Sequence, residues 1–312
     1  MGSKTHPKVP VIDFSGQKLK PGTTSWSLTG DDVRRALEEY GCFIAVYDKV
    51  SKVLENAICE AEKEVFQLPK ETKVKNIAER TYHGYVGDIS VIPLHESTGI
   101  DNATTVEGTK RFTNLMWPNG NDSFSETILS YSKLVKELDE MVQRMVFESY
   151  GLEKYCEAHK ESLYYLLRLM KYRVPETNES NIGFRAHTDK SFTAIIHQIY
   201  IDGLEIATKD DDWIPCDLLP YSFVFFAGDA LMGWSNGRIR SAKHRVILNT
   251  KEERYSVGLF SFSTGMIQVP EELVDDQHPQ RFQPFDHQKF LRFFETEEGR
   301  KPESPLQAYC GA

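Results

Sequence analysis

Apolar residues in the first half of the chain recur at spacings of three and four, interrupted by short stretches of turn-forming residues. This spacing aligns apolar side chains along one face of a helix. It predicts helices at 31–40, 51–67 and 125–150, with Thr29 as the N-cap of the first helix and Gly41 at its end. We expect the apolar faces of these helices to be core, not cofactor-binding surfaces.

The second half changes to short runs of β-branched and aromatic residues bounded by turn residues, a pattern typical of strands. The clearest runs are 194–197, 222–226 and 242–247. Asn236-Gly237 favours the positive φ angles of a tight turn, so we expect a hairpin that leads back into 242–247. The pattern predicts a mainly β fold, an antiparallel barrel or double sheet, with the helices against one outer face.

Three side chains in the strand-rich part are of the type that binds metal. His187 and Asp189 stand two apart, which places both on one face of a strand, and His244 follows from a distant strand. Two histidines and one carboxylate leave positions of an octahedral ion open, as a non-haem Fe(II) oxygenase requires. His-x-Asp alone occurs by chance in many chains. Arg254 and Ser256 in the same block make coincidence a poor explanation.

From about residue 7 to about residue 293 the chain resembles the plant 2-oxoglutarate and Fe(II)-dependent dioxygenases, which are isopenicillin N synthase-like. The resemblance implies a double-stranded β-helix (jelly-roll) core with an N-terminal helical buttress. It also implies a single catalytic domain over 1–312, with an α-rich part at 1–160, a core carrying the iron site at 161–265 and a C-terminal segment and lid at 266–312. The matching segments are 9–14, 39–43, 66–71, 228–229, 234–237 and 243–246.

Carried over residue by residue, the resemblance implies that His187, Asp189 and His244 ligate Fe(II). Arg254 and Ser256 would bind the far carboxylate of 2-oxoglutarate, since a planar guanidinium offers a bidentate fork. The implied enzyme uses O2, releases succinate and CO2, and hydroxylates a small plant specialised metabolite or hormone, with ascorbate as a candidate reductant. Asp189 stands where halogenating relatives need a small residue, which argues against chlorination.

Tyr172 stands where the family commonly has the second tyrosine of an Asn-Tyr-Tyr motif that touches 2-oxoglutarate. Met170 and Lys171 replace the asparagine and the first tyrosine, so only Tyr172 is carried over. An ordinary strand tyrosine is the alternative. This departure, together with the near-terminal residues 308–311, resembles most the branch that contains the glucosinolate side-chain oxygenases.

Substrate choice is expected in irregular segments, because loops vary while the scaffold positions them. The segment 82–117 resembles the part of the family that closes over the mouth of the barrel, and 285–294 is a candidate lid helix. Simple packing is an equally good explanation for each aromatic residue there. The candidate substrate contacts are His83, Phe112, Trp234 and Phe262.

Composition agrees with a small-molecule enzyme. The net charge of −9 and the absence of clustered Lys and Arg exclude a nucleic-acid footprint. There is no run of 18 apolar residues, and residues 1–6 lack the apolar segment of a signal peptide, so we expect a cytoplasmic monomer without membrane contact. The five cysteines form no Cys-x-x-Cys pair, which argues against disulfides and zinc sites.

Two other functions remain open at this point. An oxidase of the ethylene-forming type would keep the iron triad and the Arg-x-Ser pair without consuming 2-oxoglutarate. A small-molecule binding protein would keep the fold and lack turnover. Tyr172 and the branch resemblance favour the 2-oxoglutarate-dependent enzyme. His197 follows two isoleucines in an expected strand and needs no metal to explain it.

Overall fold

The computed structural model describes residues 8–16, 19–80 and 82–312. Residues 1–6, in which we expect no signal peptide, lie outside the described residues. The helices are α1 (Thr24–Glu39), α2 (Lys52–Gln67), α3 (Lys70–Lys73), α4 (Val106–Met116), α5 (Asp122–Ser149), α6 (Cys156–Ser162), α7 (Asp229–Trp234), α8 (His287–Glu295), α9 (Glu297–Arg300) and α10 (Pro305–Cys310), with 3-10 turns η1 (Glu153–Tyr155) and η2 (Glu271–Leu273). No helix in the described part of the chain has the length and apolarity needed to cross a membrane.

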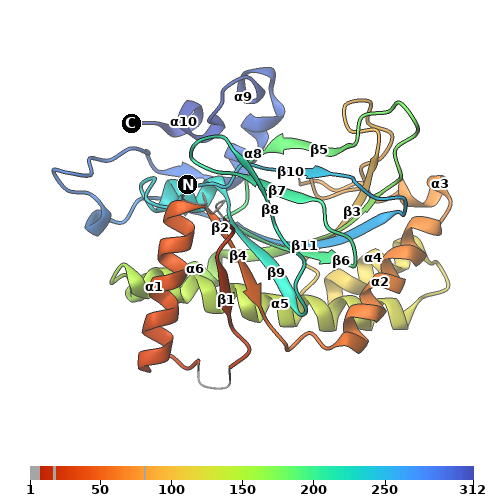
Figure 1. Cartoon of the computed structure of the whole chain (residues 1–312), viewed down its shortest axis with the longest axis horizontal. Coiled ribbons are helices and arrows are strands. Elements are labelled where there is room, and N and C mark those ends of the chain that lie inside the picture. Colours follow the sequence, from red (N-terminus) through yellow and green to blue (C-terminus); the bar gives the residue numbers. More distant parts are fainter. Residues whose placement is uncertain (1–7, 17–18, 81) are drawn as a thin grey trace, which may run out of the picture.

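Two sheets face each other, as the sequence predicts (Figure 1). The large sheet has the order β1-β2-β9-β6-β11-β4-β3, the small sheet β5-β10-β7-β8, and β12 pairs with β13. Inner side chains of both sheets, among them Ile196, Ile206 and Val246, share one apolar cluster. The strands are β1 (Val11–Asp13), β2 (Cys42–Val46), β3 (His95–Asp101), β4 (Leu163–Tyr172), β5 (Ile182–His187), β6 (Thr193–Ile199), β7 (Leu204–Ala207), β8 (Trp213–Pro215), β9 (Ser222–Ala227), β10 (His244–Ile247), β11 (Arg254–Ser263), β12 (Met266–Ile267) and β13 (Phe285–Asp286).

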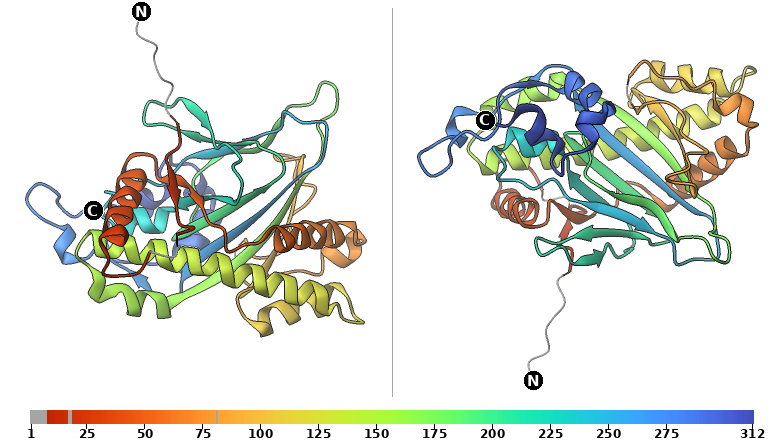
Figure 2. Two further views of the ribbon diagram at one scale, coloured as in Figure 1. Left: turned by 60° about the horizontal axis from the view of Figure 1, so that its bottom comes forward. Right: turned by 90° about the horizontal axis from the view of Figure 1, so that it is seen from above.

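The other face of the large sheet is covered by helices, with the long helix α5 running across it (Figure 2). Helices α1, α2 and α4 pack against α5, and side chains of helices and sheet form a second, larger apolar cluster. A buried polar contact also joins α5 to the sheet. The carboxylate of Asp139 accepts hydrogen bonds from the hydroxyls of Thr193 (2.6 Å) and Tyr165 (3.0 Å) and from the amide of Gln143 (2.6 Å).

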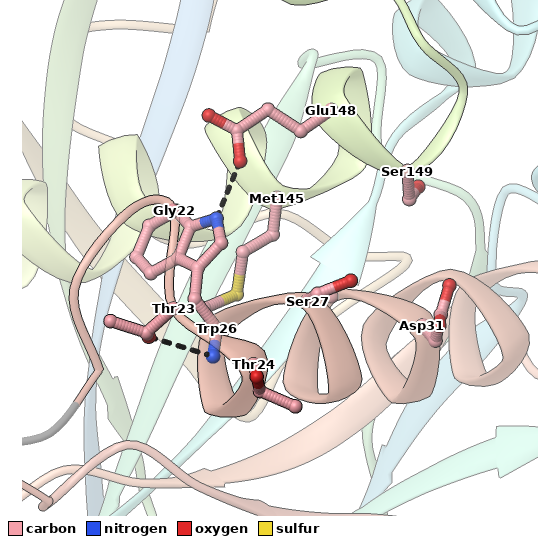
Figure 3. Close-up of a pocket in the computed structure, with 10 residues that line it drawn as sticks. Gly22, Thr23, Thr24, Trp26, Ser27, Asp31, Met145, Glu148 and Ser149 are labelled. Atoms are coloured by element: carbon pink, nitrogen blue, oxygen red, sulfur yellow. Dashed lines mark hydrogen bonds between the residues drawn. The ribbon is translucent and has the colours of Figure 1, made fainter.

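The predicted start of the first helix is wrong. Helix α1 begins at Thr24, and the Oγ1 of Thr23, not of Thr29, accepts the capping hydrogen bond from the backbone N–H of Trp26. The stretch before residue 31 is rich in Thr and Ser and so resembles a loop. The buried indole of Trp26 keeps it helical, because it packs on α5 beside Met145 and donates to Glu148 (Figure 3). A cavity of about 340 Å³ lies at this contact.

The other two predicted helices are confirmed as α2 and α5. Ser51 lies just before α2 as its N-cap, and α5 begins three residues earlier than expected, capped by Asn121. The run 242–247 is a strand only from His244 onward, whereas the runs 194–197 and 222–226 fall inside β6 and β9.

The predicted hairpin at Asn236-Gly237 is also wrong. Both residues have positive φ, 57° and 75°, but they follow helix α7 and end it, with the N–H of Gly237 donating to the carbonyl of Met232 (2.8 Å). Strand β9 pairs with β2 and β6, while β10 pairs with β5 and β7. Positive φ angles end helices as well as hairpins, so the local signal fits both.

Candidate metal centre

The three predicted metal ligands lie together at one end of the small sheet. Strand β5 ends at His187, β10 begins at His244, and the two residues are direct antiparallel partners. Asp189 follows two residues beyond His187, and its Oδ1 lies 3.6 Å from the Nε2 of His187 and 3.9 Å from the Nε2 of His244. One ligand atom from each of the three lies within 4.8 Å of the others, which is close enough for a single ion.

Backbone carbonyls orient both imidazoles. The Nδ1 of His187 lies 2.8 Å from the carbonyl of Arg185, and the Nδ1 of His244 lies 3.0 Å from the carbonyl of Ala242. A carbonyl can only accept, so Nδ1 carries the proton and the lone pair of Nε2 points toward Asp189. The Oδ2 of Asp189 is buried and has no hydrogen-bond partner among the described residues. Two imidazoles that present Nε2 and a carboxylate with a free oxygen suit a divalent ion such as Fe(II).

The electrostatic environment keeps these groups in their ligand forms. Burial opposes ionisation of Asp189, but the nearby His244 and His187 outweigh it and lower the pKa of the carboxyl. Burial, followed by the charge of His187, lowers the pKa of His244 to about 4. Both groups are therefore deprotonated near neutral pH without any metal, so little proton release is needed for an ion to bind.

Arg254 is held rigidly on the inner face of the large sheet and is only 1% exposed. Its Nη1 donates to the Oγ of Ser256 (3.1 Å), its Nη2 donates to the Oε1 of Gln198 (2.9 Å), and it lies 5.1 Å from the ring centroid of Tyr172. Tyr172 is its direct partner across β4 and β11. No carboxylate of residues 8–16, 19–80 or 82–312 lies within ion-pair distance of this guanidinium. Glu62 and Asp202 act on its charge only from beyond this distance, so no carboxylate contacts the buried guanidinium and an anionic ligand fits there.

Aromatic rings connect the Arg254 pair to the metal triad. The ring of His95 on β3 lies 4.9 Å from the rings of Tyr172 and Phe184, and Phe184 lies 4.8 Å from His187. The triad and the arginine therefore lie on the facing sides of the two sheets, joined by packed rings. Sequence reasoning missed His95, for which no local signal exists, and Gln198, whose alternation with Ile196 on β6 would have indicated an inward side chain.

The four predicted substrate contacts divide into two pairs. His83 and Phe262 meet at 5.3 Å beside Tyr164, on the inner face of the large sheet. Phe112 stacks on Phe124 (5.7 Å) between α4 and α5, and Trp234 stacks on Phe147 (4.2 Å) of α5. Phe112 and Trp234 thus belong to the outer apolar cluster, away from the triad.

His197 takes no part in the triad. Its ring faces the helices, where Nδ1 lies 3.1 Å from the hydroxyl of Tyr131 and the ring lies 4.6 Å from that of Phe223. Strand alternation sends the side chain of Gln198 inward and that of His197 outward.

Two family models match this chain. Residues 163–263, which carry the triad and Arg254, match the 2OG-Fe(II) oxygenase superfamily. Residues 9–97 match the N-terminal region of a non-haem dioxygenase in morphine synthesis. The match over 163–263 confirms the family resemblance that the sequence motifs indicated.

Individual relatives agree with the family models. The chain is 47% identical to the probable 2-oxoglutarate-dependent dioxygenase AOP1.2 of Arabidopsis thaliana, over 97% of this chain and 96% of the relative. It is 34% identical to the 2-oxoglutarate-dependent dioxygenase AOP3 of the same plant, over 100% and 99%. Among solved structures, it resembles the Arabidopsis dioxygenase for auxin oxidation 1 in complex with 2-oxoglutarate, with a TM-score of 0.79, 27% identity, and coverage of 87% of this chain and 99% of that one.

Proposed function

Because the chain belongs to the family of 2-oxoglutarate and Fe(II)-dependent dioxygenases, we propose that His187, Asp189 and His244 hold Fe(II) in it. The observation that carries this proposal is the convergence of their three ligand atoms within 4.8 Å, with both imidazoles oriented by backbone carbonyls. The triad fits the ion in ligand type, in protonation and in its open faces.

We further propose that Arg254 and Ser256 bind the far carboxylate of 2-oxoglutarate, with Tyr172 beside it. No carboxylate of the described residues forms an ion pair with the buried guanidinium, and Gln198 fixes its direction from the next strand. Two N–H groups in a fixed plane match a carboxylate better than an ammonium would. When bound, Fe(II) and 2-oxoglutarate supply the oxidising chemistry, which consumes O2 and releases succinate and CO2.

The protein's own contribution is position and the exclusion of water. His244, Arg254 and Tyr172 are each at most 5% exposed, so charges beside them interact in a medium of low polarity, whereas the side chain of His187 is 32% exposed. Rigid strands hold the triad and the arginine at fixed separation, which orients a cosubstrate that spans them. The relatives named as 2-oxoglutarate-dependent dioxygenases favour this enzyme over the oxidase and the binding protein, both of which would keep the same arrangement.

The prime substrate is a small molecule, and we propose that it is a plant specialised metabolite or hormone and that it is hydroxylated. One solved relative is named for the oxidation of auxin, a small plant compound. We also propose that residues 1–312 form one catalytic domain, that helices α1, α2 and α5 buttress the large sheet, and that the enzyme works as a cytoplasmic monomer.

The test is an anaerobic titration of the metal-free protein with Fe(II) and then 2-oxoglutarate, following the visible charge-transfer band of a chelated keto acid. The band should form in the wild type and vanish in His244→Ala. In Arg254→Ala it should require far more 2-oxoglutarate. His197→Ala is the matched control, since it removes a buried histidine from the opposite face of the large sheet and should leave the band unchanged.

Each alternative has its own outcome in this titration. Iron binding without a band would favour an oxidase that does not consume 2-oxoglutarate. Absence of iron binding would favour a binding protein. A band that persists in His244→Ala would contradict the ligand assignment.

A further inference from the structure

A second arginine lies on the inner face of the large sheet, at a distance from the first. Arg168 lies on β4, directly opposite Gly258 of β11 and Gly99 of β3. It stands four residues before Tyr172, so strand alternation gives both side chains the same inward face. Their backbones are about 13 Å apart along the strand. Arg168 is therefore a separate cationic position from the one that Arg254 and Tyr172 form.

The contacts of Arg168 leave its charge uncompensated. Its Nη2 donates to the Oγ of Ser97 (2.5 Å), and its Nη1 donates to the carbonyl of Tyr82. Both acceptors are neutral oxygens. In the part of the chain that the structure describes, no carboxylate lies within ion-pair distance of this guanidinium. Burial lowers the pKa of Arg168 to about 10, so the group stays cationic near neutral pH in surroundings that disfavour the charge.

A further polar side chain on the same face lacks a partner. His95 is 5% exposed, and its Nδ1 is buried without a hydrogen-bond partner among the described residues. It stands two residues from Ser97 on β3, so both side chains lie on the same face of the large sheet. Burial, with the charges of Arg168, His187 and Arg254, lowers the pKa of His95 to about 3, so its ring is neutral and can donate one hydrogen bond.

We propose that Arg168, Ser97 and His95 form a binding site for an anionic group of the prime substrate. This inference rests on the proposed function, because it takes the Arg254 position as that of 2-oxoglutarate. The far carboxylate of 2-oxoglutarate then binds Arg254, which leaves Arg168 to bind a second anion. Arg168 is partly buried, and a partly buried cation without a carboxylate partner is stabilised by a ligand that neutralises it.

The neighbouring side chains indicate the rest of such a substrate. Beyond Arg168 on the inner face, the rings of Phe262 and Tyr164 stack at 5.5 Å, and Phe184 lies between His95 and His187. These rings suit an apolar or aromatic body. The substrate class is therefore a small apolar or ring-containing molecule with one carboxylate, sulfate or similar anionic group.

A purely structural role is the competing explanation. Arg168 donates a hydrogen bond to the carbonyl of Tyr82 and so holds residues 82–87, called here the mouth segment, against the sheet. The ring of Tyr82 in turn lies 6.1 Å from the ring of Phe294 at the end of α8. The mouth segment lies directly over β3, since a Cβ on Gly99 would collide with the carbonyl of His83. An anchoring role would change stability and would not distinguish a charged ligand from a neutral one of the same shape.

The test measures that discrimination directly. The anaerobic protein, loaded with Fe(II) and saturating 2-oxoglutarate, is titrated by calorimetry with phenylacetate, with phenylmethanesulfonate and with the neutral phenylacetamide. The wild type should bind at least one anion roughly tenfold or more tightly than the amide, as a charge-assisted hydrogen bond predicts. Tighter binding of phenylacetate would indicate a carboxylate in the substrate, and tighter binding of phenylmethanesulfonate would indicate a sulfate-like group.

Variants then assign the preference to Arg168. Arg168→Gln should abolish the preference for the anion, while Arg168→Lys should retain part of it as a point charge. Ser97→Ala should weaken the binding of anions without removing the preference. Lys171→Gln is the matched control, because it removes a cation from the same strand on the opposite face, where Lys171 pairs with Glu253 at 2.7 Å, and it should change nothing.

The outcomes separate this inference from the proposed function. Equal affinity for anions and amide in the wild type, no binding of either anion, or a preference that survives in Arg168→Gln would overturn it. The charge-transfer band of the same samples reports independently on the Fe(II) and 2-oxoglutarate sites. If the wild type forms no band, the titrations are repeated without metal, and the anion preference still decides the role of Arg168.

Discussion

At the scale of single residues, the side chain of β6 that contacts the candidate site is Gln198 and not its neighbour His197. Histidine is the commoner functional residue, yet His197 contacts Tyr131 on the helix side. Gln198 accepts from Arg254 (2.9 Å) and from the backbone N–H of Leu204 (3.0 Å), and donates to the carbonyl of Cys216 (2.9 Å). Gln198 therefore connects the arginine to the start of β7.

Replacing this glutamine should weaken cosubstrate binding. Gln198→Met keeps the approximate volume and removes the acceptor that aims the guanidinium. Since a hydrogen bond to a charged group contributes about 1.5–3 kcal/mol, we expect the dissociation constant of 2-oxoglutarate to rise about tenfold or more. The affinity for Fe(II) should not change. The anaerobic band titration measures both constants.

The control for this substitution is His197→Phe on the adjacent position. It removes the contact with the hydroxyl of Tyr131 and should lower stability while leaving the 2-oxoglutarate affinity at the wild-type value. An unaltered 2-oxoglutarate constant in Gln198→Met would mean that Arg254 is aimed by its other contacts alone.

At the scale of elements, helix α1 shows how tertiary contacts extend a helix beyond its local signal. Its first turn, with Thr24 and Ser25, has no apolar stripe except the buried Trp26. The indole packs on α5 and donates to Glu148, so the turn gains burial that a sequence pattern cannot display.

A pair of threonine substitutions tests where this helix begins. Thr23→Ala removes the N-cap acceptor and should lower the free energy of unfolding by about 1 kcal/mol. Thr29→Ala lies inside the helix, where alanine has the higher helix propensity, and should be neutral or stabilise by less than about 0.7 kcal/mol. Urea denaturation of both variants measures the difference. Equal losses would argue against the observed helix start.

The attachment of α5 to the large sheet should make stability depend on pH. Burial raises the pKa of Asp139 from 3.8 to about 7, against the effect of its hydrogen bonds from Thr193, Tyr165 and Gln143. The folded protein thus holds this proton more tightly than the unfolded chain. Ionisation then costs folding energy, so the contribution of Asp139 to the free energy of unfolding should fall as the pH rises from about 4 to about 7.

Asp139→Asn should remove this dependence while keeping most of the hydrogen bonds. The difference in unfolding free energy between wild type and variant should change by a few kcal/mol at most between pH 4 and pH 7, in the direction that favours the variant at higher pH. Urea denaturation at several pH values measures it. Glu126→Gln is the matched control on the same helix, because Glu126 is exposed and does not contribute to the raised pKa of Asp139, so this variant should retain the wild-type slope. A constant difference across this range would contradict a raised pKa.

At the scale of the whole molecule, the end of helix α1 meets the segment before strand β10, which carries the candidate ligand His244, at Gly41. This residue has φ +72°, and a Cβ there would lie 2.6 Å from the carbonyl oxygen of Arg240 and 2.9 Å from the backbone nitrogen of Ala242. Ala242 also supplies the carbonyl that orients the ring of His244. The end of α1 therefore packs directly on the segment that positions a candidate ligand.

Gly41→Ala should consequently affect both stability and the site. Gly22 is the matched control, with φ +82° and no atom within 4 Å of an added Cβ. Gly22→Ala should cost about 1 kcal/mol from backbone strain alone. Gly41→Ala should cost clearly more, because backbone atoms must also move, and should lower Fe(II) affinity. Thermal unfolding with and without Fe(II) measures both effects, and equal losses in the two variants would show that the close approach is unimportant.

The sequence by itself determined the local elements and the chemistry of the site. Three- and four-residue periodicity is a property of neighbouring residues, so α2 and α5 were predicted nearly to their ends. The identity of His187, Asp189 and His244 as a set followed from side-chain type and from the family resemblance. The expected strand alternation was wrong for Asp189, because β5 ends at His187.

Only the tertiary structure decided which strands pair and which side chains converge. Residues far apart in sequence meet in three places. His244 pairs directly with His187, Gln198 accepts a hydrogen bond from Arg254, and Arg168 lies opposite Gly258 on the inner face of the large sheet. The positive φ angles predicted at Asn236 and Gly237 are confirmed, but the hairpin predicted from them is wrong, because the same angles end a helix here. Pairing depends on burying two sheet faces against each other, a long-range free energy that no short stretch of sequence contains.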